Sequence, residues 1–282
     1  MRKLGLVLSG GGAKGAYEIG VYKALDVLGV TKFIDAFTGT SVGALNSVLI
    51  DDRGIDFAVQ LWSELKFSDL IHINTSGISK LHKLGSIVTG NSDETIDGSF
   101  FVDMIKNGYP VSQEKIEQII QSNVSFRNIT RKIYVVCSQR LKKMTCFTLN
   151  EYDPEVQRKI VLASSAIPGI YRGFEGIKID DDFYYDGGIT PAGNTPILPM
   201  YEKGYRKIIA VHLKSNPYTA DQCQFVDADI LNIIPSRSLG NFITGTLYLN
   251  SRKVVGDMEL GYYDTINKSA DIMKLVNSLA EY

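Results

Sequence analysis

The stretch FIDAFTGTSVGALNSVLI, residues 33–50, joins an apolar run, a serine flanked by glycines and a second apolar run. Residues 33–38 predict a strand, residues 39–43 a tight turn and residues 44–50 the start of a helix. The turn, GTSVG, matches the G-x-S-x-G pattern in which a sharp strand-to-helix turn presents a serine hydroxyl above a sheet edge. Taken alone, the pattern fits a glycine-rich turn without chemistry equally well.

The segment before this stretch repeats the same logic. Residues 4–8 (LGLVL) predict a buried strand, residues 9–12 a turn and residues 13–28 a helix that ends at Gly29. Two successive strand–turn–helix units predict an α/β fold with a largely parallel sheet flanked by helices.

The rest of the chain predicts further elements of both kinds. Strands are expected at residues 132–138, 144–149, 183–185 and 207–213, and helices at 56–65, 111–124, from Asp153-Pro154 to before Pro168, and through the last forty residues. Residues 66–110 show no clear period, which predicts a lid-like insert. No internal repeat or low-complexity linker divides residues 1–282, so we expect one domain with a helical C-terminal part.

Composition excludes several classes of protein. The formal net charge of −1 gives no global attraction to nucleic acid. The three cysteines are odd in number and fit neither a disulfide framework nor zinc-ligand spacing, which predicts a reducing compartment. The first apolar run is short for a signal peptide and no stretch reaches the length of a membrane span, so we expect a cytoplasmic protein. Neither a metal nor a cofactor is expected.

The loop GGGAKG, residues 10–15, admits several interpretations. It is not a P-loop, because Ala16 stands where Lys-Ser/Thr would follow. It fits the dinucleotide fingerprint G-x-G-x-x-G, and Asp35 follows at about the spacing of a ribose-binding acid, although the apparent strand continues past it. Bare amides at a helix start also suit an oxyanion hole. A purely structural glycine turn is the remaining alternative.

A serine nucleophile needs a base, and histidine is scarce. His72 and His82 lie in the irregular insert, and His212 lies within a buried strand pattern. Asp186 follows an aromatic strand and precedes two glycines, and burial beside tyrosines would raise its pKa toward that of a useful base. A simple Asp-Gly-Gly turn is the alternative for this residue.

Together these motifs resemble the patatin-like phospholipase family over about residues 4–215. Besides GGGAKG and GTSVG, the family's motifs match DGG at 186–188, ASSAIP at 163–168 against A-S-x-x-x-P, and NTP at 194–196 against N-x-P. The resemblance implies a three-layer α/β/α sandwich with a central, mostly parallel sheet, as in cytosolic phospholipases and acyl carrier protein transacylases. Thr40 and Val42 flank the serine where the transacylases carry histidine, which counts against transacylase chemistry.

The resemblance also implies roles for individual residues. Ser41 would be the nucleophile and Asp186 the base of a dyad without histidine. The amides of the loop at Gly10, Gly11 and Gly12 would form the oxyanion hole. Lys14 stands where the family carries Lys or Arg, and we expect it to hold the loop or to attract a phosphate head group.

These observations predict a serine-dependent lipid acyl hydrolase of the phospholipase A or lysophospholipase type, acting on a lipid or fatty-acyl ester through an acyl-serine. Residues 66–110, with Phe100-Phe101, would touch the lipid surface transiently. Two alternatives remain open: a Rossmann-like nucleotide-binding protein that uses the same glycine loop, and a non-catalytic patatin-like binding protein.

Overall fold

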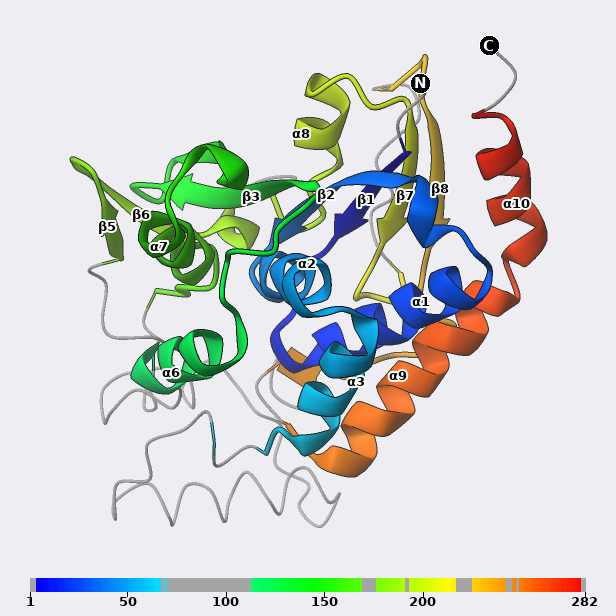
Figure 1. The fold of residues 1–282 in the computed structure, drawn as a ribbon, viewed down its shortest axis with the longest axis horizontal. Coiled ribbons are helices and arrows are strands. Elements are labelled where there is room, and N and C mark those ends of the chain that lie inside the picture. Colours follow the sequence, from blue (N-terminus) through cyan, green and yellow to red (C-terminus); the bar gives the residue numbers. More distant parts are fainter. Residues whose placement is uncertain are drawn as a thin grey trace.

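A mostly parallel sheet with helices on both faces forms the centre of the molecule (Figure 1), as the sequence predicts. The computed structural model describes residues 4–66, 69, 113–168, 176–190, 193–216, 225–241, 245–246 and 249–279. Apart from residues 66 and 69, the expected insert at 66–110, with Phe100-Phe101, His72 and His82, lies outside the described residues.

The described strands are β1 (Leu4–Leu8), β2 (Ile34–Thr40), β3 (Lys132–Gln139), β4 (Lys143–Thr148), β5 (Ile177–Ile179), β6 (Asp182–Asp186), β7 (Lys207–Val211) and β8 (Asp229–Ile233). The described α-helices are α1 (Ala16–Val27), α2 (Val42–Arg53), α3 (Ile55–Glu64), α6 (Gln113–Asn123), α7 (Pro154–Ser164), α8 (Ile197–Glu202), α9 (Ser251–Ile266) and α10 (Ser269–Asn277). All expected elements in these regions are confirmed, and β5, α8 and β8 are additional.

The strand order is β5-β6-β3-β2-β1-β7-β8, and β4 pairs with β3. The pairs β1–β2, β1–β7, β2–β3 and β7–β8 are parallel, whereas β4, β5 and β6 join the sheet antiparallel. The two strand–turn–helix units therefore lie side by side as β1 and β2, and their carboxyl ends share one edge of the sheet.

Each face of the sheet buries its own apolar cluster, because alternate side chains of a strand point to opposite faces. Leu6 and Leu8 of β1 join the larger cluster, which packs under α1, α2 and α7. Val7 points the other way and joins a smaller cluster with Met200 of α8. In Figure 1, α8 lies on one face of the sheet and α1 and α2 lie on the other. This layering is the α/β/α arrangement expected from the sequence.

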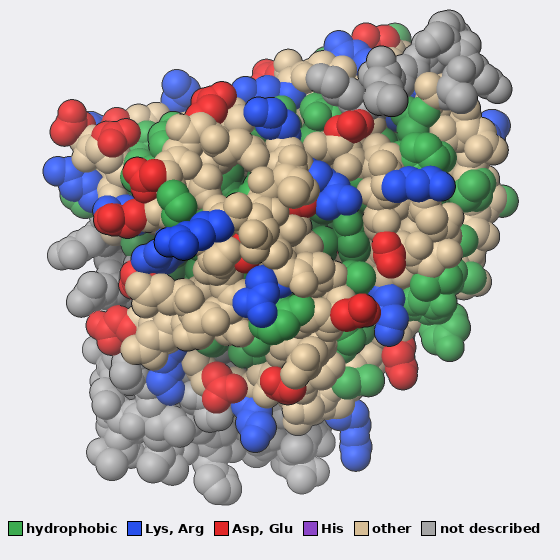
Figure 2. Space-filling model, viewed as in Figure 1, with side chains coloured by type: hydrophobic (Ala, Val, Ile, Leu, Met, Phe, Trp, Pro, Cys, Tyr) green, Lys and Arg blue, Asp and Glu red, His purple; other side chains and the backbone are tan. Residues whose placement is uncertain are grey.

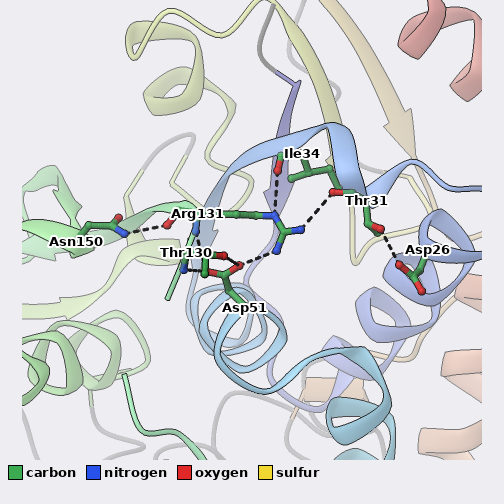
Figure 3. A network of polar contacts seen from close by, with 7 residues as sticks. All are labelled: Asp26, Thr31, Ile34, Asp51, Thr130, Arg131 and Asn150. Atoms are coloured by element: carbon green, nitrogen blue, oxygen red, sulfur yellow. Dashed lines mark hydrogen bonds and ion pairs between the residues drawn. The ribbon is translucent and has the colours of Figure 1, made fainter. Parts of the chain in front are cut away.

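A polar network fixes the sheet edge opposite the serine turn (Figure 3). Asp51, in the last turn of α2, accepts hydrogen bonds from the backbone amides of Thr130 (2.6 Å) and Arg131 (2.9 Å). The Arg131 guanidinium contacts Asp51 at 2.7 Å and donates to the carbonyls of Ile34 and Thr31. The far end of α2 is thereby tied to the beginnings of β2 and β3.

The surface carries charges of both signs. Figure 2 shows Lys and Arg side chains interspersed with Asp and Glu on the face viewed, without a continuous patch of one sign. Among the described residues, no helix combines the length and the apolar character needed to cross a bilayer.

Candidate active site

Ser41 occupies the turn between β2 and α2 in a conformation that few side chains adopt. Its φ is 55° and its ψ is −124°, and it is 7% exposed. Its carbonyl accepts the amides of Ala44 (3.0 Å) and Leu45 (3.1 Å), so it caps the helix through its backbone and leaves its hydroxyl for other contacts. Strained backbone of this kind persists only where the surrounding structure enforces it, and it concentrates at functional sites.

The glycines of the GTSVG turn are required by close backbone approach. A Cβ on Gly39 would lie 2.5 Å from the Ala44 nitrogen, and a Cβ on Gly43 would lie 2.4 Å from the Leu8 carbonyl oxygen. The turn thus folds onto itself and against the end of β1, as the G-x-S-x-G pattern predicts.

Ser164, the last residue of α7, supports the turn from the side. Its hydroxyl accepts a hydrogen bond from the Ser41 amide (2.8 Å) and donates one to the Val136 carbonyl (2.7 Å). The sequence places Ser164 only in the ASSAIP segment, and the motif does not disclose this contact with a residue 123 positions earlier.

Strand topology brings Asp186 to the serine. β2 runs parallel to β3 and ends with Thr40 opposite Val136, whereas β6 runs antiparallel to β3 and ends with Asp186 opposite Cys137. The carboxyl ends of β2 and β6 therefore meet at neighbouring positions of β3. Ser41, the next residue after β2, emerges beside Asp186.

The Asp186 carboxyl is buried and hydrogen-bonded. It is 5% exposed, and its Oδ1 accepts the Gly188 amide at 2.7 Å. Burial raises the pKa of Asp186 to about 6, against the lowering effect of hydrogen bonds from the Ser41 side chain and the Gly188 amide. This is the direction expected from the sequence, and it gives a carboxylate that is basic near neutral pH.

The glycine loop approaches the serine closely, but its three glycines are not equivalent. The Gly10 amide donates to the Asn194 carbonyl at 2.8 Å, so it is occupied and the prediction of Gly10 as an oxyanion donor is corrected. For the amides of Gly11 and Gly12, no acceptor is found among the described residues. A Cβ on Gly11 would lie 2.7 Å from Leu213, and Gly12 has a φ of +58° with Thr246 packed against it.

Lys14 is a buried cation in the short helical turn, Gly12–Gly15, with which the loop ends. It is 8% exposed, and its pKa is lowered by burial and by the positive charges of Lys253 and Lys214, while Asp257 opposes the shift. Lys14, Lys214, Ser41 and Asp186 together line a cavity, which we call the polar cavity after these four side chains. Gly10, Gly11 and Gly12 of the glycine loop line it as well.

A second, apolar cavity also borders Ser41. Its walls come from one face each of α2, α3 and α6. The apolar side chains that line it are Ala13, Val42, Leu45, Leu49, Leu61, Trp62, Leu65, Ile116, Ile119, Ile120, Val124 and Leu249. Ser41, Gly12 and Thr246 line both cavities, so the serine lies at their junction.

His212 takes no part in this arrangement. It follows β7, is 1% exposed, and its Nε2 contacts Asn232 Oδ1 at 2.8 Å. Burial lowers its pKa, and it lines neither of the two cavities that contain Ser41. It is the packed strand-end histidine that its surrounding sequence predicts.

The geometry of Asp35 argues against the nucleotide-binding alternative. Asp35 lies at the start of β2, and its carboxylate accepts the Leu4 amide at 3.0 Å. The glycine loop follows the carboxyl end of the parallel neighbour β1. The acid therefore lies at the opposite edge of the sheet from the loop, where it cannot reach a ribose bound there. Among the described residues, no group of three His, Cys, Asp or Glu side chains could hold a metal ion.

The fold and the turn define an α/β protein with a strained serine at the carboxyl edge of a mostly parallel sheet. A family model described as patatin-like phospholipase matches residues 6–201, and the chain belongs to this family. It is 28% identical over 286 residues to the probable lipid hydrolase 463L of Invertebrate iridescent virus 6, covering 96% of this chain and 89% of the viral protein. A 48-residue segment is 52% identical to lysophospholipase nte1 of Aspergillus terreus, which is 17% of this chain and 3% of the fungal protein.

Two solved structures share the fold. Human GIVD cytosolic phospholipase A2, in complex with methyl gamma-linolenyl fluorophosphonate, has a TM-score of 0.56 at 11% identity, over 99% of this chain and 59% of the human chain. VipD from Legionella pneumophila has a TM-score of 0.52 at 12% identity, over 96% of this chain and 67% of that chain. The chain thus spans little more than half of the human phospholipase chain and a small part of the fungal protein.

Proposed function

We propose that this protein is a serine-dependent lipid acyl hydrolase, with Ser41 as nucleophile and Asp186 as base. The observation that carries the proposal is that Ser41 and Asp186, at the adjoining ends of β2 and β6, line one cavity, where the buried Asp186 carboxyl has its pKa raised to about 6. A base of this strength is ionised at neutral pH and accepts a proton more readily than an ordinary aspartate.

In the proposed reaction, Asp186 takes the Ser41 proton while the serine oxygen attacks the ester carbonyl carbon. The carbonyl oxygen becomes an oxyanion that the Gly11 and Gly12 amides stabilise. The tetrahedral intermediate collapses, and the leaving alcohol takes the proton from Asp186. Water, deprotonated by the same carboxylate, then attacks the acyl-serine, and the fatty acid leaves as the serine regains its proton.

The apolar cavity supports a fatty acyl group as the part of the substrate bound beside the carbonyl. Val42, Leu45 and Leu49 follow one face of α2, and their span of seven residues is about 10 Å at the helical rise. A chain buried along this stripe loses contact with water, which favours binding in proportion to the number of methylenes buried. We therefore expect kcat/KM to rise with acyl chain length.

The polar cavity supports an alcohol that carries an anionic group. Lys14 and Lys214 both line it, and neither lines the apolar cavity. Two cations near the leaving group would hold a phosphate by charge-assisted hydrogen bonds. This supports a phospholipid or lysophospholipid as substrate over a neutral glyceride, and Lys14→Met should lower activity on the former more than on the latter.

The decisive experiment is labelling of the purified chain with a fluorophosphonate probe. We expect the wild-type protein to label and Ser41→Ala to remain unlabelled. Asp186→Asn should lower the turnover of a p-nitrophenyl ester by about 100-fold or more, which is the usual contribution of a general base. A folded wild-type chain that neither labels nor turns over any ester would instead be the non-catalytic binding protein.

His212→Ala provides a control for the choice of base. Since His212 lines neither cavity around Ser41, its replacement should leave kcat nearly unchanged. If His212→Ala abolishes turnover while Asp186→Asn does not, the assignment of Asp186 is wrong.

A further inference from the structure

A buried carboxyl lies behind the glycine loop, outside the proposed dyad. Glu18, in the first turn of α1, is fully buried, and its Oε2 accepts a hydrogen bond from Asn46 Nδ2 at 2.8 Å. The Ser9 amide lies close enough to this carboxyl to lower its pKa. Its Oε1 finds no partner among the described residues. A buried acceptor left unpaired costs stability, so a compensating role is expected.

Asn46 links this carboxyl to two other elements. It is 1% exposed and lies on α2, little more than one turn after Ser41. Its Nδ2 also donates to the Gly15 carbonyl at 3.0 Å, and its Oδ1 accepts the Trp62 indole N–H at 2.9 Å. One amide side chain thus joins the end of the glycine loop, the helix of the serine and a wall of the apolar cavity.

The contacts hold the end of the glycine loop. Asn46 donates to the carbonyl of Gly15, which ends the loop, and the Glu18 carboxyl bonded to Asn46 lies near the amide of Ser9, which precedes the loop. A Cβ on Gly15 would lie 2.4 Å from Val42 Cγ2, so the loop end is pressed against the first turn of α2. The Gly11 and Gly12 amides lie between Ser9 and the fixed end at Gly15.

We propose that Glu18 and Asn46 are positioning residues, which fix the glycine loop against α2 and so set the Gly11 and Gly12 amides relative to Ser41. The expected effect of these two residues on the rate rests on the proposed function. Their expected effect on the position of the loop does not depend on any activity. Oxyanion donors act only when preorganised, and a displacement of about 1 Å can cost about 100-fold in rate.

The protonation state of Glu18 fits this role. Burial raises its pKa to about 8, against the lowering effect of the bonds from Asn46 and Ser9, and no charged side chain contributes to the shift. The carboxyl is therefore mostly neutral at pH 7. A neutral group can accept the Asn46 hydrogen bond without placing a second negative charge near the developing oxyanion.

The test compares Glu18→Ala, Glu18→Gln and Asn46→Ala with Asn150→Ala. Asn150 is the matched control, because its side chain also bonds two backbone groups, the Arg131 carbonyl and the Ile133 amide, but at the opposite edge of the sheet. Two readouts are needed: steady-state kinetics on a p-nitrophenyl ester, and hydrogen exchange of a peptide covering residues 9–15.

We expect Glu18→Ala and Asn46→Ala to lower kcat by about 10- to 100-fold and to speed exchange in residues 9–15. KM should stay nearly constant for Glu18→Ala, whereas Asn46→Ala should also raise KM, because Asn46 lines the apolar cavity and holds Trp62. Glu18→Gln should retain kcat within a few-fold at pH 7, because it mimics the neutral acid. Glu18→Ala removes an unpaired buried oxygen, so this variant should fold even if Asn46→Ala does not.

Unchanged exchange of residues 9–15 in the folded variants would overturn the proposal, whether or not the protein is an esterase. So would kcat values within about twofold of Asn150→Ala in an active enzyme. If the wild type shows no esterase activity but exchange accelerates in the Ala variants, the loop assignment stands and the proposed function fails.

Discussion

At the scale of single residues, the candidate site depends on one carboxylate being ionised. Because burial raises the pKa of Asp186 to about 6, the group is protonated below that pH and cannot accept the Ser41 proton. We therefore expect kcat/KM to rise with pH through about 6 and to level off above it. Rates on a p-nitrophenyl ester between pH 4.5 and 7.5 would measure this limb. An apparent pKa near 4 would contradict a buried, basic Asp186.

Ser164 gives a second prediction at this scale. Ser164→Ala removes the acceptor of the Ser41 amide and the donor to the Val136 carbonyl, and leaves both groups buried. We expect the free energy of unfolding to fall by about 1–3 kcal/mol, and kcat to fall because the serine turn loses its lateral support. Thermal unfolding and labelling rates of the folded protein would measure the two effects. Normal labelling in a destabilised variant would show that Ser164 serves stability alone.

The residues that sequence analysis identified share a local signal, and those that it missed do not. Ser41 and Asp186 each stand beside glycines at the end of an apolar run. Ser164 and Asn46 act through partners brought close only by the fold. The same holds for Gly10, whose amide is occupied by the carbonyl of a residue far along the chain. No spacing within one segment could have disclosed these contacts.

At the scale of elements, α1 and α9 pack through two glycines. A Cβ on Gly20 would lie 1.9 Å from the Met258 carbonyl oxygen, and a Cβ on Gly261 would lie 2.1 Å from the Tyr17 carbonyl oxygen. α1 lies within the helix expected at residues 13–28, and its last residue, Val27, is 64% exposed. The partner of α1 comes from the C-terminal part of the chain, where no recognised motif indicated what the helices cover.

Within α9, replacement of glycine by alanine is expected to have opposite effects on stability at Gly261 and at Gly256. Gly261→Ala should separate α9 from α1 and destabilise the protein, because backbone atoms cannot move aside as a flexible side chain can. Gly256→Ala meets only the end of Arg237, 4.0 Å away, and should stabilise the helix by about 0.5–1 kcal/mol through its better helix propensity. Thermal unfolding of the two variants would measure the contrast. Equal shifts in Tm would contradict the close packing of α1 and α9.

At the scale of the whole molecule, the site forms because β2 and β6, which run in opposite directions, both end beside the same part of β3. β2 and β6 are far apart in the sequence and reach neighbouring positions of β3 from opposite ends. The sequence predicted the parallel half of the sheet from two repeated units. It could not predict that β6 pairs antiparallel with β3, because the sequence of a short aromatic strand does not show which strand it will pair with or in which direction.

Two buried carboxyls make the stability of the whole chain depend on pH in a definite direction. The folded-state pKa values of Glu18, about 8, and Asp186, about 6, lie above their ordinary values of 4.5 and 3.8. The native state therefore binds these protons more tightly than the unfolded state, and stability is lost as pH rises from the ordinary value to the raised one. Glu18→Gln and Asp186→Asn each replace one of these carboxyls by an amide that does not ionise. Each variant therefore lacks one contribution to the loss of stability at rising pH.

The difference in Tm between a variant and the wild type, followed over pH, reports the contribution of the replaced carboxyl alone, because all other titrating groups are present in both proteins. For Asp186→Asn, the difference should rise with pH up to about 6 and then stay constant. For Glu18→Gln, it should continue to rise up to about 8, because the Glu18 carboxyl is held neutral over a wider range by its burial. Thermal unfolding of the three proteins between pH 4.5 and 9 would supply both curves. Parallel Tm profiles would mean that neither carboxyl is buried as described, and the basic character of Asp186 would lose its physical cause.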